Sequence, residues 1–447
     1  MVGMTMDIFA RELPNQRNRP WSLVSLTVAA MLIATLFLTR FALTLGEREL
    51  SFPLVVVLLG TAVLLVTGAV TISPTRALLF GTAMAAMLAA SVFGGAVRVS
   101  WASYLNVVLL YACYMTVAPD DFEFARAIRL FRLFMVVIAI AGIVQFFAQV
   151  AIRGPTLFTF NGIFPAQIIS HGFNYVIPVP GLGGLNKSNG FFLVEPSSFS
   201  QLTALAIIIE LEFFRPSWRL GLFGAGLVLS FSGTGLLLFV AIVPLYMIRR
   251  GWGGLLLLGV PTALAGAALL AGPKLAALLG RVGEIGSDQS SAFARFLSPF
   301  YLFDQYLFPN LDTTLFGMGP GSIEPFFKKA AYQIHDPTWG KLVFEYGLVG
   351  AAPFLIFVMH CFFAGTRSIW LSSALFLNYL ILGGNLVDAR VQTLILVLVV
   401  LQNRPADIRH AQAAAARANR TPSWPGESAP DNDARTETRT PAPPHWQ

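Results

Sequence analysis

Apolar stretches of roughly 20 residues recur along most of the chain, and they limit the possible folds more than any single motif does. A helix needs about 20 mostly apolar residues to cross the hydrocarbon core of a bilayer. Only 12% of the 447 residues are charged, whereas soluble domains carry about 25%. We therefore expect an all-α integral membrane protein with about 12 transmembrane helices, in a range of about 11 to 13. The candidate spans are 21–43, 52–72, 77–96, 101–117, 129–151, 191–213, 219–232, 235–248, 253–272, 340–362, 368–384 and 390–402.

The distribution of arginines predicts the orientation of this membrane domain, residues 21–402. Loops on the cytoplasmic side of a membrane carry an excess of Lys and Arg. A cytoplasmic N-terminus, residues 1–20, would leave only three arginines in the short outside connections: Arg48, Arg98 and Arg390. The inside segments would then hold fourteen: Arg11, Arg17, Arg19, Arg76, Arg126, Arg129, Arg132, Arg215, Arg219, Arg249, Arg250, Arg367, Arg404 and Arg409. Because these charges are scattered over short loops, they do not indicate nucleic-acid binding.

With this orientation, two long loops, 152–190 and 273–338, lie outside the cytoplasm. Residues 403–447 lack an apolar period, and we expect a disordered cytoplasmic tail there. Residues 1–20 are polar and have no small-residue cleavage site before the first span, so no cleavable signal is expected. Both termini are therefore predicted to be cytoplasmic.

The first long loop ends in a motif that places an acidic residue beside an apolar span. Glu195 precedes Pro196, which suits the first turn of a helix. An ionisable group flanked by membrane sequence is a candidate functional residue, although Glu195 can also simply cap its helix. Lys187 lies eight residues earlier. It is suited to binding a phosphate or diphosphate, or to reaching lipid headgroups.

The second long loop contains two arginines that suit diphosphate recognition. The planar guanidinium of arginine donates two hydrogen bonds at once. For Arg281, surface ion pairs with Glu284 or Asp288 are the simpler interpretation. For Arg295, whose neighbours include Phe293 and Phe296, burial in a site is favoured.

Two further features of this loop are a glycine-rich run and a histidine. Residues 317–322 can form a tight turn or present backbone N–H groups to an anion, but they lack the ending of a P-loop. His335 precedes the span that starts near 340 and can act as a base or donate to a phosphate. It can equally be an interfacial residue beside Trp339. No His, Cys or carboxylate cluster has metal-ligand spacing, so no metal and no cofactor is expected.

The order of these motifs over residues 130–400 resembles that of the Wzy-type polysaccharide polymerases and the related O-antigen ligases. The first half contributes Lys187, Gly190, Glu195-Pro196-Ser197 and Ser232-Gly233-Thr234-Gly235. The second half contributes Arg295, Gly317-Met318-Gly319-Pro320-Gly321, His335 and residues 344–350. Two positions differ from the usual pattern. Lys187 stands where arginine is common, and Glu-Pro-Ser replaces the Asn-Pro-Asn-like form of many ligases.

The resemblance implies a metal-independent glycosyltransferase in the bacterial inner membrane. Such an enzyme joins undecaprenyl-diphosphate-linked oligosaccharide units into long exopolysaccharide or O-antigen chains at the outer face. Its implied partners are this lipid-linked substrate, membrane lipids, a chain-length regulator and a flippase. Arg295, Lys187 and Arg281 would bind the diphosphate. Either His335 or Glu195 would act on the proton of the acceptor hydroxyl, and the sequence does not choose between them.

Three other functions are compatible with the sequence. A ligase would transfer finished glycan to another acceptor. A flippase or transporter would move the lipid-linked units, but transporters usually place polar sites near the bilayer midplane, and here the central spans look nearly free of charge. A docking platform would use the large loop to bind other assembly proteins and would tolerate single Arg or His changes in it.

Overall fold

The computed structural model describes residues 21–45, 48–94, 99–118, 122–152, 154–179, 184–254, 291–327 and 335–404, with 406 and 409. Most of these residues are helical. The longer helices are α1 (Leu23–Leu36), α2 (Phe52–Val66), α3 (Pro74–Phe93), α4 (Trp101–Ala112), α5 (Phe122–Ala148), α6 (Pro196–Phe213), α7 (Trp218–Leu229), α8 (Gly233–Arg249), α15 (Thr338–Phe363), α16 (Ile369–Leu377) and α17 (Ala389–Leu398). The shorter ones are η1 (Cys113–Met115), η2 (Pro155–Leu157), η3 (Ala166–Ile168), α11 (Ser291–Phe296), α12 (Ser298–Leu302), η5 (Phe303–Leu307), α13 (Leu311–Phe316), α14 (Glu324–Phe327), η6 (Asn378–Leu382) and η7 (Val400–Gln402).

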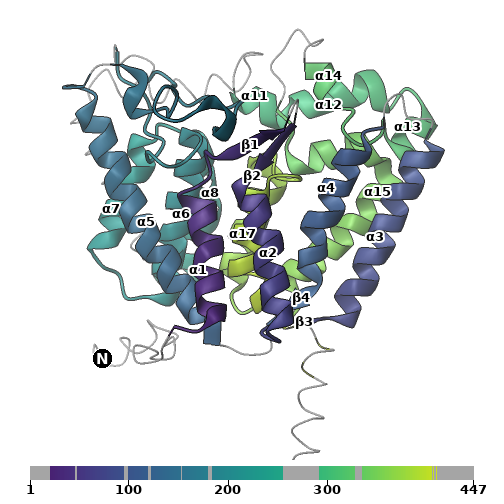
Figure 1. The fold of residues 1–447 in the computed structure, drawn as a ribbon, viewed down its shortest axis with the longest axis horizontal. Coiled ribbons are helices and arrows are strands. Elements are labelled where there is room, and N and C mark those ends of the chain that lie inside the picture. The colour runs from purple at the N-terminus through teal and green to yellow at the C-terminus, as the bar shows by residue number, and fades with distance from the viewer. Residues whose placement is uncertain are drawn as a thin grey trace, which may run out of the picture.

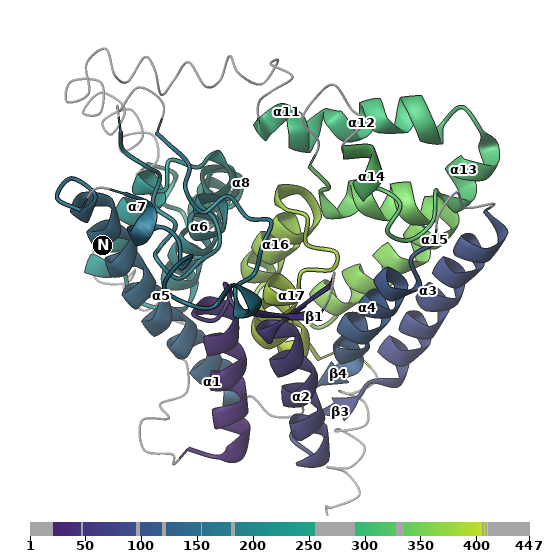
Figure 2. The ribbon, with the colours of Figure 1, turned by 45° about the horizontal axis from the view of Figure 1, so that its top comes forward.

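The long helices form two groups on either side of a central set. Helices α5 to α8 lie on one side, α3, α4 and α15 lie on the other, and α1, α2 and α17 stand between them (Figure 1). The short helices α11 to α14 lie across one end of this bundle, over α15 and α3 (Figure 2). We call this end, which α11 to α14 cover, the loop end. Buried apolar side chains from all three groups form one continuous core.

Three described helices are long and apolar enough to cross a membrane: Pro74–Phe93, Phe124–Ala148 and Thr338–Phe363. Shorter apolar helices occupy seven further segments in the part of the chain that the structure describes: Leu23–Leu36, Phe52–Val66, Trp101–Met115, Trp218–Leu229, Gly233–Arg249, Ile369–Leu382 and Ala389–Gln402. These lengths support membrane association. The count of about 12 spans stays a prediction, and most of the candidate span 253–272 lies outside the described residues.

The sequence predicts an all-α protein, but the structure also contains short strands. Strands β1 (Ala42–Leu45) and β2 (Arg48–Ser51) pair antiparallel, and so do β3 (Thr71–Ile72) and β4 (Thr116–Val117). Helix α1 ends at Leu36, before the end of its apolar stretch. The chain then reverses direction within a short connection to α2, and its free backbone groups pair with each other across the turn. Hydropathy alone does not reveal such short ribbons.

A buried arginine joins several segments at the end of the bundle that lies opposite the loop end. The distribution of arginines places Arg76 in a segment on the cytoplasmic side. In the structure its side chain has no exposed surface. Its guanidinium donates to the carbonyl oxygens of Thr116, Val400 and Asn403 at 2.7–2.9 Å. The side-chain amide of Asn403 donates in turn to two carbonyls near the end of α15. Asn403, the first residue of the expected tail, is therefore tied to the bundle.

Helix α15 is interrupted, and the interruption joins it to the glycine-rich run of the large loop. Gly347 has φ +59°, outside the helical region. A side chain there would collide with the carbonyl of Leu315. Nearby, the backbone N–H groups of Met318 and Gly319 donate to two carbonyls of α15, each at 2.9 Å. A side chain at Gly317 would likewise collide with the backbone of α15. Both Gly317 and Gly347 therefore need to be glycine, and this contact fixes the large loop on α15.

Candidate functional site

Three segments that are far apart in the sequence meet at the loop end. Glu195 immediately precedes α6, Arg295 lies in α11, and His335 lies just before α15. The backbone N–H of His335 donates to the carbonyl oxygen of Ala294 at 3.0 Å. This bond sets the histidine beside the arginine, and the carboxylate of Glu195 acts electrostatically on both. The structure thus brings together three of the residues selected from the sequence.

The charges in this cluster act on one another. Burial lowers the pKa of Arg295, and the negative charge of Glu195 opposes that shift. Arginine stays protonated in either case. Burial also lowers the pKa of His335, although part of its side chain is exposed, and the positive charge of Arg295 lowers it further. Asp336 and Glu195 act in the opposite direction. At neutral pH the imidazole is therefore uncharged and can accept a proton.

We expect the pKa of His335 to respond to the charge at position 295. Diethyl pyrocarbonate acylates only neutral imidazole, so the reaction rate at each histidine against pH reports its titration. In the wild-type protein the midpoint for His335 should fall below 6.5, the ordinary value. In Arg295→Gln it should move upward, because a nearby positive charge has been removed. Mass spectrometry of the His335 peptide measures this, and an unchanged midpoint would contradict the proximity of the two side chains.

The side chain of Glu195 bonds to the first long loop and to Ser197 instead of capping its helix. Its backbone is extended and Pro196 follows at the first helical position, but its side chain makes no capping bond to α6. One carboxylate oxygen accepts from the hydroxyl of Ser197 at 3.0 Å. The other accepts from the backbone N–H of Asn174, in the first long loop, at 3.4 Å. The simple capping interpretation is thus not supported by the geometry.

A buried arginine fixes the segment that leads to Glu195. Arg40, between α1 and β1, is 1% exposed. Its Nε and Nη2 donate to the carbonyl oxygen of Leu193 at 2.9 and 2.6 Å, and its Nη1 donates to that of Phe158 at 2.9 Å. The guanidinium also lies over the rings of Phe160 and Tyr175. One side chain therefore positions both ends of the first long loop.

Replacing Arg40 with alanine should destabilise the loop end. The change leaves the carbonyl of Leu193 buried without a donor and removes one of the two donors to the carbonyl of Phe158, and hydrogen bonds from charged groups contribute about 1.5–3 kcal/mol each. We expect a lower unfolding temperature in detergent, measured by intrinsic fluorescence, and faster proteolysis within 152–190. Arg40→Lys is the matched control, since it retains the charge but only one donor position. Equal melting of wild type and Arg40→Ala would refute this role.

The residues around Lys187 are hydrogen-bonded to the end of α5 and to the rest of the first long loop. The side chain of Asn189 accepts from Gln145 at 2.8 Å and donates to the carbonyl oxygens of Phe158 and Tyr175. The backbone N–H of Lys187 donates to the carbonyl of Ile177 at 2.8 Å. The assignment of Lys187 to diphosphate binding stays a prediction.

The remaining motifs divide into structural ones and one that cannot be placed. Arg281 lies outside the described residues. In the run 317–322, the N–H groups of Met318 and Gly319 are used by α15, so these two are not available to an anion and the tight-turn interpretation holds there. The Ser232–Gly235 motif lets α8 touch α6. A side chain at Gly235 would collide with Ser200, whose hydroxyl accepts from its N–H at 3.0 Å.

The sequence analysis did not select a group of ion-paired residues that follows His335 in the chain. Lys341, inside α15, is 5% exposed and lies 3.2 Å from a carboxylate oxygen of Asp336 and 3.7 Å from one of Glu345. Near the other end of α6, Glu210 and Glu212 are also buried. The expectation that the central spans are nearly free of charge is therefore wrong for α6 and α15. The signal available in the sequence for these charges was the presence of ionisable residues inside apolar stretches.

An ion pair at the start of α17 was also not predicted from the sequence. In the sequence analysis, Arg390 contributes only to the predicted orientation. In the structure, Asp388 holds it by two hydrogen bonds of 2.7 Å, and its guanidinium lies 4.5 Å from the centre of the Phe173 ring. The charge of Arg390 also interacts with Glu195. An acidic and a basic residue two positions apart, bordering an apolar span, were the available signal.

In the part of the chain that the structure describes, no three His, Cys, Asp or Glu side chains are grouped so that they would hold a metal ion. The cluster of Glu195, Arg295 and His335 instead combines a cation, a neutral base and a carboxylate. Comparison of the sequence with protein-family models gives no match, and comparison with curated proteins gives none either. Function is therefore argued from the site itself.

Proposed function

We propose that this protein is a bacterial polysaccharide polymerase of the inner membrane. In this proposal the loop end faces outward, both termini are cytoplasmic, and the bundle contains about 12 spans. The substrate is an oligosaccharide unit linked to undecaprenyl diphosphate, and the product is a longer exopolysaccharide or O-antigen chain on the same carrier. A chain-length regulator and a flippase are the expected partner proteins.

The observation that carries the proposal is the meeting of Arg295, His335 and Glu195 at one end of an apolar bundle. Transfer of a sugar from a lipid diphosphate needs a cation for the leaving group and a base for the incoming hydroxyl. It also needs both groups beside the membrane, where the lipid chain stays. The neutral imidazole of His335, held next to Arg295 through Ala294, supplies this combination.

In the proposed reaction, the acceptor hydroxyl oxygen attacks the anomeric carbon of the donor sugar. The bond from that carbon to the diphosphate oxygen breaks, and its electron pair stays on the diphosphate. Arg295 stabilises the charge that develops there. His335 takes the proton of the acceptor hydroxyl. Its lowered pKa favours His335 over Glu195 for this step, and Glu195 orients the two.

The buried charges at the end of α6 do not favour a transporter. Glu210 lies 3.6 Å from Arg132 and 3.9 Å from Arg219. Glu212 lies 3.3 Å from Arg250. Both glutamates are in the last turn of α6, away from the middle of the helix, whereas transporters usually bind substrate at broken helices near the midplane. A ligase would use the same chemistry as a polymerase and differs in its acceptor.

Analysis of the lipid-linked products in a deletion strain tests the proposal. Loss of a polymerase leaves single repeat units on undecaprenyl diphosphate. Loss of a ligase leaves long chains on the same carrier, and loss of a flippase leaves single units facing the cytoplasm. Single units that are accessible from outside the membrane are the expected result. Normal polymer in the deletion strain would refute the proposal.

A further inference from the structure

A buried lysine lies six residues after His335, inside the apolar helix α15. Lys341 is 5% exposed, and lysine is seldom fully buried unless it is paired. Its Nζ donates to the Oδ2 atom of Asp336 at 3.2 Å and lies 3.7 Å from a carboxylate oxygen of Glu345. An ionisable side chain within an apolar helix of a membrane protein is a candidate functional residue. None of the steps in the proposed reaction uses this lysine.

The two carboxylates connect Lys341 to different parts of the loop end. Asp336 belongs to the segment of His335. Glu345 lies one turn further along α15 and is 1% exposed. Its backbone carbonyl accepts from the N–H of Gly319, in the glycine-rich run, at 2.9 Å. Lys341 therefore joins the segment of His335 to the part of α15 on which the large loop is fixed.

Asp336 is also fixed by close contact with the loop between η6 and α17. A Cβ atom at Gly384 would lie 2.8 Å from the Oδ1 atom of Asp336 and 2.9 Å from its backbone carbonyl oxygen. These distances are well below a normal van der Waals separation, so only glycine lets the loop pack this close. The other carboxylate oxygen, Oδ2, is the one that accepts from Lys341. The carboxylate is thus held from two sides.

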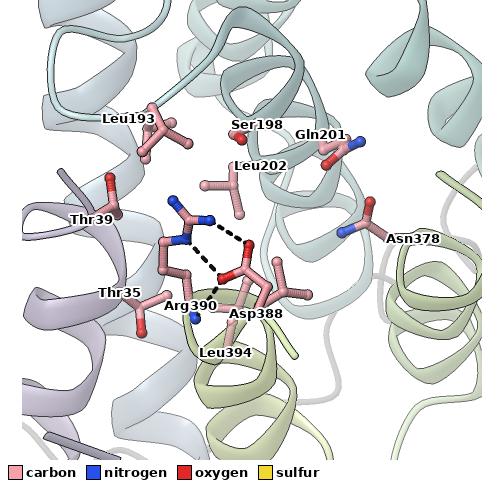
Figure 3. A pocket seen from close by; sticks show the side chains of 12 residues that line it. Thr35, Thr39, Leu193, Ser198, Gln201, Leu202, Asn378, Asp388, Arg390 and Leu394 are labelled. Atoms are coloured by element: carbon pink, nitrogen blue, oxygen red, sulfur yellow. Dashed lines mark hydrogen bonds and ion pairs between the residues drawn. The ribbon is translucent and has the colours of Figure 1, made fainter. Parts of the chain in front are cut away.

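The same loop is bonded to the first turn of α15. The N–H of Thr338 donates to the carbonyl of Gly383 at 3.3 Å, and its hydroxyl accepts from the N–H of Asn385 at 3.1 Å. The amide of Asn385 donates in turn to the carbonyl of Asn378 at 2.9 Å. Asn378 lines a small pocket between α1, α6, η6 and the start of α17 (Figure 3). The backbone that follows His335 is therefore tied to the helices around this pocket.

The ion pair also affects the charge around His335. The charged groups that act on the imidazole are Arg295 on α11, Glu195 before α6, and Asp336. Burial lowers the pKa of His335 and Arg295 lowers it further, whereas Asp336 and Glu195 raise it. A cation bonded to Asp336 offsets part of its effect. Lys341 therefore helps to keep the imidazole neutral, as a base requires.

We propose that Lys341 is a positioning residue for the proposed reaction: it holds Asp336 and, through it, keeps His335 in place for the acceptor hydroxyl. This role rests on the proposed function. Lys341 does not reach the substrate, because it is buried and its Nζ is committed to carboxylates. The charge of Glu324 on α14 acts on it as well. Without the lysine, the carboxylates of Asp336 and Glu345 would repel each other, and Asp336 would move together with His335.

The first experiment measures the environment of His335 and needs no substrate. Full-length protein in nanodiscs is labelled with diethyl pyrocarbonate at a series of pH values, and mass spectrometry gives the midpoint for the His335 peptide. Lys341→Met should move this midpoint upward, because Asp336 then acts on the imidazole without its counter-ion. Lys341→Arg keeps the charge and should match wild type. Adding Asp336→Asn to Lys341→Met removes the unpaired charge and should lower the midpoint again.

Arg250→Met is the matched control, because it removes a cation that pairs with the buried Glu212 at the opposite end of α6 from Glu195. Breaking a buried ion pair is destabilising, so this variant and Lys341→Met should both melt at a lower temperature than wild type. Only Lys341→Met should move the His335 midpoint. A midpoint equal to that of wild type in folded Lys341→Met protein would leave the lysine with a structural role alone and overturn the proposal.

The second experiment measures the rate of elongation on lipid-linked repeat units. Lys341→Met should lower the rate at saturating substrate about 10- to 100-fold and leave KM near the wild-type value, since misplacing a catalytic group by about 1 Å has an effect of this order. Gly384→Ala should act in the same direction, because it pushes against Asp336 without altering any charge. Wild-type rates in Lys341→Met would also overturn the proposal. If the midpoint shifts as expected but the wild-type protein elongates no units, the action of Lys341 on His335 stands and the proposed function is refuted.

Discussion

Replacing Arg295 with alanine is expected to reduce polymer synthesis about 100- to 1,000-fold, the usual effect of removing one group that stabilises developing charge. The variant removes a positive charge that acts on His335 and interacts with Glu195. Single repeat units should therefore accumulate on the lipid carrier, and gel analysis of surface and lipid-linked glycan measures both. Because the site lies at one end of the bundle, the protein should still reach the membrane at normal levels.

Two variants control this experiment. Arg219→Ala removes a partly exposed arginine from the start of α7, beside Glu210 at the far end of α6 from Glu195. It should leave polymer synthesis within about 2-fold of wild type, because the buried Glu210 keeps its closer ion pair with Arg132 at 3.6 Å. Arg295→Lys retains the charge without the planar fork and should recover part of the activity. Normal polymer from a well-expressed Arg295→Ala protein would exclude the proposed site.

His335→Gln should lower the rate of chain elongation about 100- to 10,000-fold, the usual contribution of a general base. Glutamine keeps a polar side chain of similar reach but cannot take up a proton at neutral pH. The binding of undecaprenyl diphosphate should change little, so the effect falls on the rate at saturating substrate. In wild type, activity should decline with falling pH only below 6.5, because the pKa of His335 lies below that ordinary value.

The matched control for this change is His171→Gln. His171 is also exposed and paired with a carboxylate, Glu49, at 2.8 Å, but it belongs to the first long loop. Its substitution should leave elongation within about 2-fold of wild type, because an exposed contact of this kind contributes little. Equal losses in the two variants would indicate a general effect of altered loops, and full activity in His335→Gln would remove His335 from the mechanism.

The large elements and the principal site followed from local properties of the sequence. Long apolar runs fixed the positions of α3, α5 and α15, because burial in a core or a membrane both require them. Pro196 placed the start of α6. The pairing of Glu195 with Arg295 and His335 was inferred from their common side of the membrane, and the structure places them in one cluster.

What the sequence could not supply were contacts between backbones that are distant along the chain. The sequence allowed the glycine run near 317 to form a tight turn or to present N–H groups to an anion. It did not reveal the bonds from this run to the interrupted α15, which depend on Gly347. Asn189 lies two residues after Lys187, and its amide bonds to α5 and to the first long loop. The pocket between α1, α6, η6 and α17 (Figure 3) has the same origin, because residues of these four helices line it together only through tertiary packing.

The most direct test of polymerase function uses the purified protein in liposomes with its lipid-linked repeat units and no second protein. The account predicts products of two or more units on undecaprenyl diphosphate, formed by wild type and by His171→Gln but not by Arg295→Ala or His335→Gln. Single units that stay unchanged in length, or that only cross the bilayer, would contradict it.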